Sequence, residues 1–175
     1  MPQNARVVEA LAALATQHDF RIGVAESLTS GQLAAALGTG SDAADWFRGG
    51  LVAYAAQVKF DVLGVTPGPV VTAECARQMA RGASRLLGAD AVVATTGVGG
   101  PEPEEGEPPG TVYVATLVRG HASGLRLDLP GDPPQVLRQT RAHALDVLLD
   151  AMRARAGVLS ERRRPGTRRA GAPAG

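Results

Sequence analysis

The chain has 175 residues, of which 45% are hydrophobic and 20% charged, and its formal net charge is +1. This size and composition indicate a soluble, globular protein with one domain and enough length to bury a core. No apolar run approaches the roughly 20 residues of a membrane helix. The single cysteine, Cys75, excludes an internal disulfide and fits a reducing cytoplasm.

The charge is distributed unevenly along the chain. Residues 156–175 carry five arginines and one glutamate, a net charge of +4, which leaves −3 on residues 1–155. The end of the chain is rich in Gly, Pro, Ala and Arg and shows no apolar period, so we predict a domain over residues 1–155 and a disordered basic tail over residues 156–175. Since the body is acidic, a nucleic-acid partner is not expected.

The first half of the chain alternates between helical and strand-like patterns. The N-terminal segment is amphipathic with polar breaks, which is unlike a signal peptide. Apolar spacing predicts, in chain order, a helix over about residues 5–17, a strand over 21–26, a helix over 27–38, a strand over 49–54, a helix over 55–63 and a helix over 73–87 with Thr72 as its N-cap.

The second half predicts more strands than helices. We expect an apolar strand over 90–97, a polar loop over 98–109, an antiparallel pair over 110–120 and 122–130, and a final helix that begins near Asp132. Strands separated by helices form parallel neighbours, and a direct strand pair adds antiparallel character. The fold class is therefore α/β, a three-layer α/β/α sandwich with a mixed, mainly parallel sheet.

Polar side chains follow three of these strands. Ser27 follows the first strand, Tyr54 and Lys59 follow the second, and Thr96 and Gly97 follow the third. In open α/β sheets, ligands bind outside the carboxyl ends of the parallel strands. If the three strands are neighbours, these residues line one crevice.

Lys59 is the only lysine of a chain whose other 17 basic residues are arginine. Arginine stays protonated in proteins, whereas a desolvated lysine can become a neutral base. Ser27 could simply cap the next helix, but Thr29 and Ser30 can also supply that cap. Ser27 and a neutral Lys59 would then form a nucleophile–base pair.

Other catalytic schemes have less support in the sequence. The three histidines, His18, His121 and His143, are far apart, and none follows a strand end. The acidic run over residues 101–109 lacks a metal-ligand pattern and is interpreted as a solvated loop, so no metal and no cofactor are expected. A phosphate-binding P-loop or dinucleotide-binding glycine pattern is missing as well.

Four ordered motifs resemble a known family. They are VAESLTSG, a tyrosine and a lysine five positions apart (Tyr54 and Lys59), TTGVGGP and PPGTVYVA. Together they are similar to the C-terminal domain of the competence/damage-inducible protein CinA, a domain that also occurs alone as a nicotinamide-nucleotide amidohydrolase. The resemblance covers roughly residues 4–155. It does not extend to the pyrophosphatase-type domain of longer relatives, so we expect no pyrophosphatase activity.

The resemblance implies both an activity and a set of site residues. It implies a three-layer α/β/α domain that hydrolyses nicotinamide mononucleotide (NMN) to nicotinate mononucleotide and ammonia without a metal, in pyridine-nucleotide salvage in the cytoplasm. It also implies a homo-oligomer. The family's serine and lysine map onto Ser27 and Lys59 as catalytic residues, with Tyr54 relaying a proton or orienting the lysine. The same mapping places the following residues around the substrate: Glu26, Thr29, Ser30, Gly31, Thr96 and Gly97.

The chain departs from the family pattern at two places that bear on substrate choice. Ser30 stands where the family usually has glycine, and GDPP over residues 131–134 replaces a stretch that usually contains arginine. Arg48, just ahead of the second strand, is a candidate for the substrate phosphate. Two alternatives stay open: an amidase for another small carboxamide, and a non-catalytic nucleotide- or partner-binding module of the competence/DNA-damage system.

Overall fold

The computed structural model of the chain describes residues 3–163. The helices are α1 (Gln3–His18), α2 (Gln32–Leu37), α3 (Ala43–Trp46), α4 (Ala56–Asp61), α5 (Ala73–Leu87) and α6 (Pro133–Arg163). The strands are β1 (Ile22–Glu26), β2 (Phe47–Val52), β3 (Ala91–Gly97), β4 (Thr111–Val118) and β5 (His121–Asp128). Within the described residues, no helix combines the length and the apolar character needed to cross a membrane.

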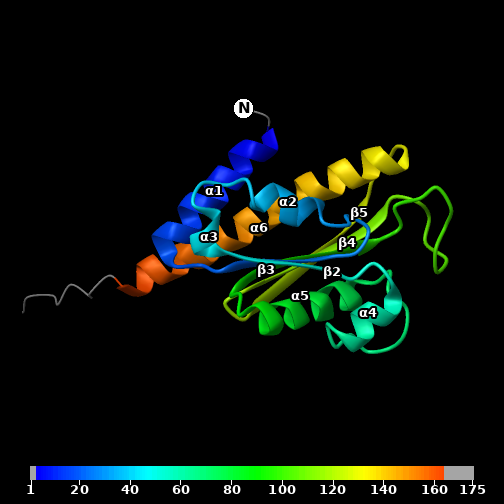
Figure 1. The fold of residues 1–175 in the computed structure, drawn as a ribbon, viewed down its shortest axis with the longest axis horizontal. Coiled ribbons are helices and arrows are strands. Elements are labelled where there is room, and N and C mark those ends of the chain that lie inside the picture. Colours follow the sequence, from blue (N-terminus) through cyan, green and yellow to red (C-terminus); the bar gives the residue numbers. More distant parts are fainter. Residues whose placement is uncertain (1–2, 164–175) are drawn as a thin grey trace, which may run out of the picture.

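The five strands form one mixed sheet in the order β2-β1-β3-β4-β5 (Figure 1). β1 pairs with both β2 and β3 in parallel, whereas the β3–β4 and β4–β5 pairings are antiparallel. Glu26 of β1 lies level with Val52 of β2 and Thr95 of β3. The three parallel strands therefore end together at one edge of the sheet, as the sequence predicted.

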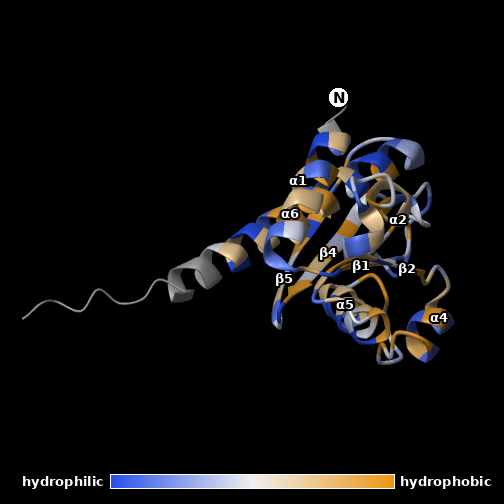
Figure 2. Ribbon diagram, turned by 60° about the vertical axis from the view of Figure 1, so that its left-hand side comes forward, coloured by the Kyte–Doolittle hydropathy of each residue, from blue (hydrophilic) through white to orange (hydrophobic). Residues whose placement is uncertain are grey.

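Helices cover both faces of this sheet, with α1, α2, α3 and α6 on one face and α4 and α5 on the other (Figure 1). The two faces carry separate hydrophobic cores. One core includes Leu11, Ile22 and Leu145, and the other includes Leu63, Met79 and Val92. The hydrophobic central strands lie between the two helical layers (Figure 2). This arrangement confirms the three-layer α/β/α architecture.

The helices α5 and α6 begin where their sequence signals predict. α5 spans Ala73–Leu87, and the Thr72 hydroxyl caps it by accepting a hydrogen bond of 3.0 Å from the Cys75 N–H. The N-terminus of α6 is capped by Asp132, whose Oδ1 accepts a 2.8 Å hydrogen bond from the Gln135 N–H. Side-chain caps at both helices satisfy N–H groups that would otherwise lack a partner.

The helix predicted over residues 27–38 is much shorter in the structure. Residues 27–31 form turns, and α2 begins only at Gln32. Ser30 and Gly31 have φ values of 49° and 95°, which a right-handed helix cannot accommodate. The sequence also gave no sign of the four-residue helix α3, because one turn is too short to show a period.

The last helix extends past residue 155, where the sequence places the boundary between domain and tail. α6 continues to Arg163, so the first residues of the predicted disordered tail are helical. Between Val158 and Arg163 the sequence contains neither glycine nor proline, and nothing in it breaks a helix that is already under way. The rest of the predicted tail, residues 164–175, lies outside the described residues.

Candidate active site

A pocket of about 310 Å³ lies at the carboxyl ends of β1 and β3. Six of the residues predicted for the site line it: Ser27, Ser30, Tyr54, Lys59, Thr96 and Gly97. They come from the segments that follow β1, β2 and β3, which the sheet order makes neighbours. The structure thus brings the proposed catalytic residues together, although they are spread over about 70 positions of the chain.

Lys59 is almost completely buried, with 1% of its surface exposed. Its Nζ donates a 3.0 Å hydrogen bond to the Tyr54 carbonyl oxygen, at the turn where β2 leads into α4. Burial lowers the pKa of the ammonium from its ordinary value of 10.5, because a charge is poorly solvated there. Electrostatic interactions with Cys75, Glu104 and Glu105 raise this pKa and oppose the effect of burial. A lowered pKa is what a general base needs.

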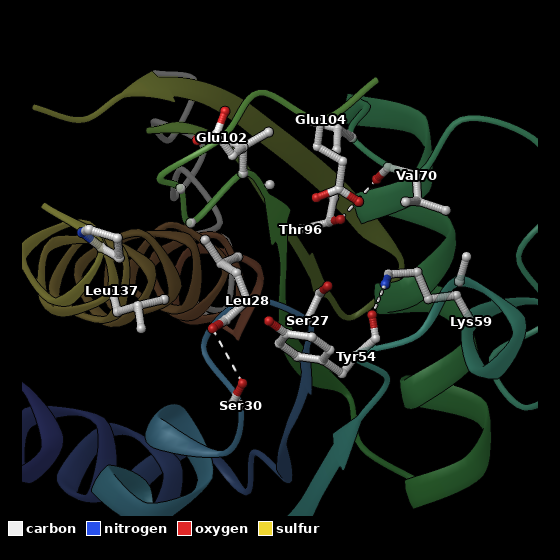
Figure 3. A pocket seen from close by; sticks show the side chains of 17 residues that line it. Ser27, Leu28, Ser30, Tyr54, Lys59, Val70, Thr96, Glu102, Glu104 and Leu137 are labelled. Carbon is white, nitrogen blue, oxygen red and sulfur yellow. Dashed lines mark hydrogen bonds between the residues drawn. The ribbon is translucent and has the colours of Figure 1, made fainter. Parts of the chain in front are cut away.

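Ser27 occupies the first position after β1. Its N–H donates a 3.1 Å hydrogen bond to the Thr95 carbonyl oxygen, which fixes the residue beside β3. The hydroxyl of Ser27 and the ammonium of Lys59 point into the pocket toward one another (Figure 3). Within the described residues, no hydrogen bond joins the two groups. A nucleophile–base contact often tightens only when substrate is bound.

Tyr54 contributes to the site through two separate parts. Its backbone carbonyl holds the Lys59 ammonium, while the residue itself is 70% exposed and lies at the rim of the pocket (Figure 3). Since the carbonyl orients the lysine, the backbone rather than the phenol makes the observed contact. An exposed aromatic ring at a pocket rim is a surface on which a flat ligand can stack.

Thr96 and Gly97 continue β3 into the pocket wall. The Thr96 hydroxyl is buried and donates a 2.8 Å hydrogen bond to the Val70 carbonyl oxygen (Figure 3). Gly97 packs so closely on β4 that a Cβ there would collide with the Thr111 carbonyl oxygen. Both residues therefore line the pocket and also hold neighbouring segments in place.

Three of the residues predicted to contact substrate do not line the pocket. The Glu26 carboxylate is fully buried and accepts hydrogen bonds of 2.8–3.0 Å from the N–H groups of Gly31, Leu33 and Ala34. The Thr29 hydroxyl is also buried and shares a 2.9 Å hydrogen bond with the Thr95 hydroxyl. Their contacts support the turn that presents Ser27, and their polar atoms are already occupied.

The capping by Glu26 also changes which N–H groups can bind an oxyanion. The sequence suggested the first N–H groups of the following helix, but three of the N–H groups at the start of α2 are bonded to Glu26. The N–H groups of Leu28 and Thr29 have no acceptor among the described residues. They directly follow Ser27, and Leu28 lines the pocket.

Sequence reasoning missed the part of the wall that comes from loops, from the first residue of α4 and from α6. These residues are Leu28, Ala56, Val70, Val71, Val98, Gly99, Gly100, Glu102, Glu104, Pro133 and Leu137. Most of them do not directly follow a strand, and only the fold places them beside Ser27. The acidic residues Glu102 and Glu104 belong to the run that the sequence led us to interpret as a solvated loop.

The candidate phosphate ligand, Arg48, is not part of the pocket. Its Nε donates a 3.3 Å hydrogen bond to the Leu87 carbonyl oxygen at the end of α5. Within the described part of the chain, the pocket lining contains no arginine, and Lys59 is its only cationic residue. Pro133 stands in the lining at the stretch where the sequence departs from the family pattern.

A family model described as the CinA C-terminal domain matches residues 4–152. The chain belongs to the CinA family. Among curated relatives, a CinA-like protein of Frankia casuarinae is 38% identical over 140 residues, which are 77% of this chain and 32% of the relative. A putative competence-damage inducible protein of Geobacillus kaustophilus is 37% identical over 145 residues, 79% of this chain and 35% of the relative.

Solved structures of CinA superfamily proteins have the same fold. The protein from Escherichia coli is 33% identical with a TM-score of 0.81, and the match covers 83% of this chain and 88% of that one. The protein from Klebsiella pneumoniae 700603 is 31% identical with a TM-score of 0.82, covering 86% and 98%. This CinA-family chain thus spans about a third of the curated relatives named above, but most of these single structures.

Proposed function

We propose that this CinA-family chain is an amidohydrolase that deamidates NMN to nicotinate mononucleotide and ammonia. The observation that carries the proposal is the only lysine of the chain, buried with a lowered pKa in the wall of a pocket that also presents the Ser27 hydroxyl. Burying a lysine costs free energy, and side chains with pKa values shifted by burial cluster at functional sites. The resemblance of the site motifs to nicotinamide-nucleotide amidohydrolases supports this choice of substrate.

The proposed reaction is acyl transfer through a serine ester. Neutral Lys59 takes the proton of the Ser27 hydroxyl while Oγ attacks the carboxamide carbon. The tetrahedral intermediate then collapses, the C–N bond breaks, and Lys59 returns the proton to the leaving nitrogen, which departs as ammonia. Water next attacks the nicotinoyl ester, with Lys59 again accepting a proton, and Ser27 is released with its hydroxyl restored.

The oxyanion of the tetrahedral intermediate needs hydrogen-bond donors beside Ser27. We assign this role to the N–H groups of Leu28 and Thr29, which have no acceptor among the described residues. Donors that are fixed before the reaction stabilise a developing negative charge without reorganising. The Glu26 carboxylate holds the start of α2 and thereby fixes the turn that carries both N–H groups.

The test is ammonia release from NMN by purified wild-type protein and by three variants. Ser27→Ala removes the nucleophile, and Lys59→Arg keeps the positive charge but cannot lose its proton at neutral pH. We expect both to lose at least about 100-fold in kcat, the usual contribution of a catalytic base or nucleophile. Ser123→Ala changes an exposed serine on β5 and serves as the control. Near-normal activity of Lys59→Arg would refute the base role.

A second candidate is an amidase for a small carboxamide without a phosphate. The composition of the pocket favours it: the described lining holds two carboxylates, Glu102 and Glu104, and no arginine that could pair with a phosphate. A panel of NMN, its dephosphorylated nucleoside and nicotinamide, scored by ammonia release, separates the two. A large preference for NMN supports the first function, and equal rates with the nucleoside support the second. A protein that binds NMN without releasing ammonia would be a binding module.

A further inference from the structure

The acidic loop between β3 and β4 contains a small hairpin. The N–H and carbonyl groups of Glu104 and Glu107 pair with each other at 3.1 and 2.9 Å, which leaves Glu105 and Gly106 as the two turn residues. Both have positive φ, 51° and 81°, as a two-residue type I′ turn requires. Glycine adopts this conformation freely, whereas glutamate adopts it at a cost. The structure must therefore hold Glu105 in place by other contacts.

Those contacts are made by the Glu105 carboxylate. It accepts hydrogen bonds from the Val70 N–H at 2.8 and 3.0 Å, one to each oxygen, and from the Val71 N–H at 2.7 Å. The carbonyl oxygen of Val70 accepts the hydrogen bond from Thr96 described above. The peptide groups around Val70 are thus held from one side by the acidic hairpin and from the other by β3.

Val70 and Val71 form part of the pocket wall, in the segment that links α4 to α5. This segment also contacts Lys59 directly, because the Val65 N–H donates a 3.1 Å hydrogen bond to the Lys59 carbonyl oxygen. We infer that Glu105 is a positioning residue of the site: its carboxylate fastens this wall over Lys59. The inference deepens the proposed function and depends on it for its catalytic meaning.

The charged and titratable groups that act on Lys59 come from two parts of the chain. Cys75 lies on α5, and Glu104 and Glu105 lie in the acidic hairpin. Burial raises the pKa of the Cys75 thiol to about 11, so this thiol is neutral near pH 7. The two carboxylates are then the negative charges that favour the ammonium. Removing either one should make Lys59 lose its proton at lower pH.

Two variants separate the fastening role from the charge. Glu105→Asn removes the charge and shortens the side chain, while asparagine suits a turn residue with positive φ better than glutamate does. Glu104→Gln removes a charge from the same hairpin, but the Glu104 side chain has no hydrogen bond to the Val70–Val71 backbone. Urea denaturation first checks that both variants are folded.

Hydrogen exchange of the Val70 and Val71 amides tests the fastening. In the wild type we expect slow exchange, and in Glu105→Asn an acceleration of at least about tenfold, the factor that corresponds to losing one charge-assisted hydrogen bond. Glu104→Gln should exchange at the wild-type rate. Unchanged protection of both amides in Glu105→Asn would overturn the inference.

Selective labelling of lysine tests the charge, because the only lysine of the chain gives a single side-chain NMR signal. The pH titration of this signal should move to lower pH in both Glu105→Asn and Glu104→Gln. A titration of Glu105→Asn that coincides with that of the wild type would overturn the role of the charge. Neither this titration nor the exchange experiment needs turnover, so each can succeed or fail whether or not the wild type releases ammonia from NMN.

If the wild type turns over NMN, the rise of kcat/KM on the acid side of its pH profile tests the effect of both variants on catalysis. This rise should shift to lower pH in both variants, since both lose a charge that favours the ammonium. kcat at the plateau should fall in Glu105→Asn, in which the wall is no longer fastened. A plateau in Glu105→Asn equal to that of the wild type would contradict a positioning role for Glu105.

Discussion

At the scale of single residues, the burial of Lys59 suits the role of a base that we propose for it. The side chain is 1% exposed, and burial lowers the pKa of its ammonium, which makes the neutral form accessible nearer to neutral pH. The hydroxyl of a serine is not activated in this way, because it is a poor nucleophile until a base removes its proton. In the proposed reaction, the lysine therefore controls when Ser27 can react.

This control predicts the pH dependence of the reaction. Below the pKa of Lys59 the ammonium cannot accept a proton, so kcat/KM for NMN should rise with pH and level off once the lysine is neutral. Because the pKa in the folded protein lies below the ordinary 10.5, the midpoint of the rise should also lie below it. Steady-state kinetics across the alkaline range would measure this, and a profile that ignores pH up to 10.5 would contradict the assignment.

The contact between Tyr54 and Lys59 leads to a second prediction. Since the backbone carbonyl of Tyr54 accepts the hydrogen bond, Tyr54→Phe keeps that contact and the exposed ring. We expect kcat within about threefold of the wild type, a difference below roughly 1 kcal/mol in the barrier. A loss as large as that of Lys59→Arg would instead show that the phenol takes part in proton transfer.

At the scale of elements, the short helix α2 depends on a residue outside it. Glu26 ends β1, and its carboxylate accepts three N–H groups at or just before the start of α2, where the positive end of the helix favours a negative charge. The turn that contains Ser27 lies between Glu26 and the start of α2. The Glu26 carboxylate therefore links the start of α2 to the turn that positions Ser27, the proposed nucleophile.

Replacing this carboxylate by an amide should weaken the fold. Glu26→Gln removes the charge and turns an NH₂ group toward N–H donors, so we expect a loss of about 1.5–3 kcal/mol in the free energy of unfolding, measured by urea denaturation. Glu9→Gln is the control: Glu9 also accepts an N–H group, from Ser41, but in a more exposed position, and should lose less than about 1 kcal/mol. Equal losses of unfolding free energy in the two variants would show that the burial of Glu26 does not increase its contribution to stability.

The elements also show which parts of the fold the sequence can predict. α5 was predicted with its true ends, because Thr72 signals the start and Gly88, with a φ of 59°, provides the stop. α2 was predicted too long, because its capping carboxylate belongs to Glu26, six residues before its first residue, Gln32. Sequence signals predict the ends of a helix when the capping residues adjoin the helix. They fail when the capping side chain belongs to the preceding strand.

At the scale of the whole molecule, the sheet order decides which site residues could be predicted. Ser27, Lys59 and Thr96 follow strands whose ends meet, and the strand-end rule for parallel sheets was enough to group them. Val70 and Leu137 come from a loop and from α6, and only the packing of these segments brings them to the pocket. A sequence does not show where such segments lie, because their position depends on how the loop and the helix pack in the folded protein.

The pocket thus joins segments from both helical layers, which predicts that a ligand stabilises the molecule as a whole. Ser27→Ala should still bind NMN, since it lacks only a hydroxyl, and it cannot consume the ligand during the measurement. At 100 times the Kd, binding adds about 2.7 kcal/mol to the free energy of unfolding, and Tm should rise by roughly 5–10 °C. Thermal unfolding of Ser27→Ala with NMN, and with nicotinamide as the control ligand, would measure it. A Tm that NMN leaves unchanged at millimolar concentration would argue against NMN as the substrate, whereas a rise in this variant without turnover by the wild type would identify a binding module.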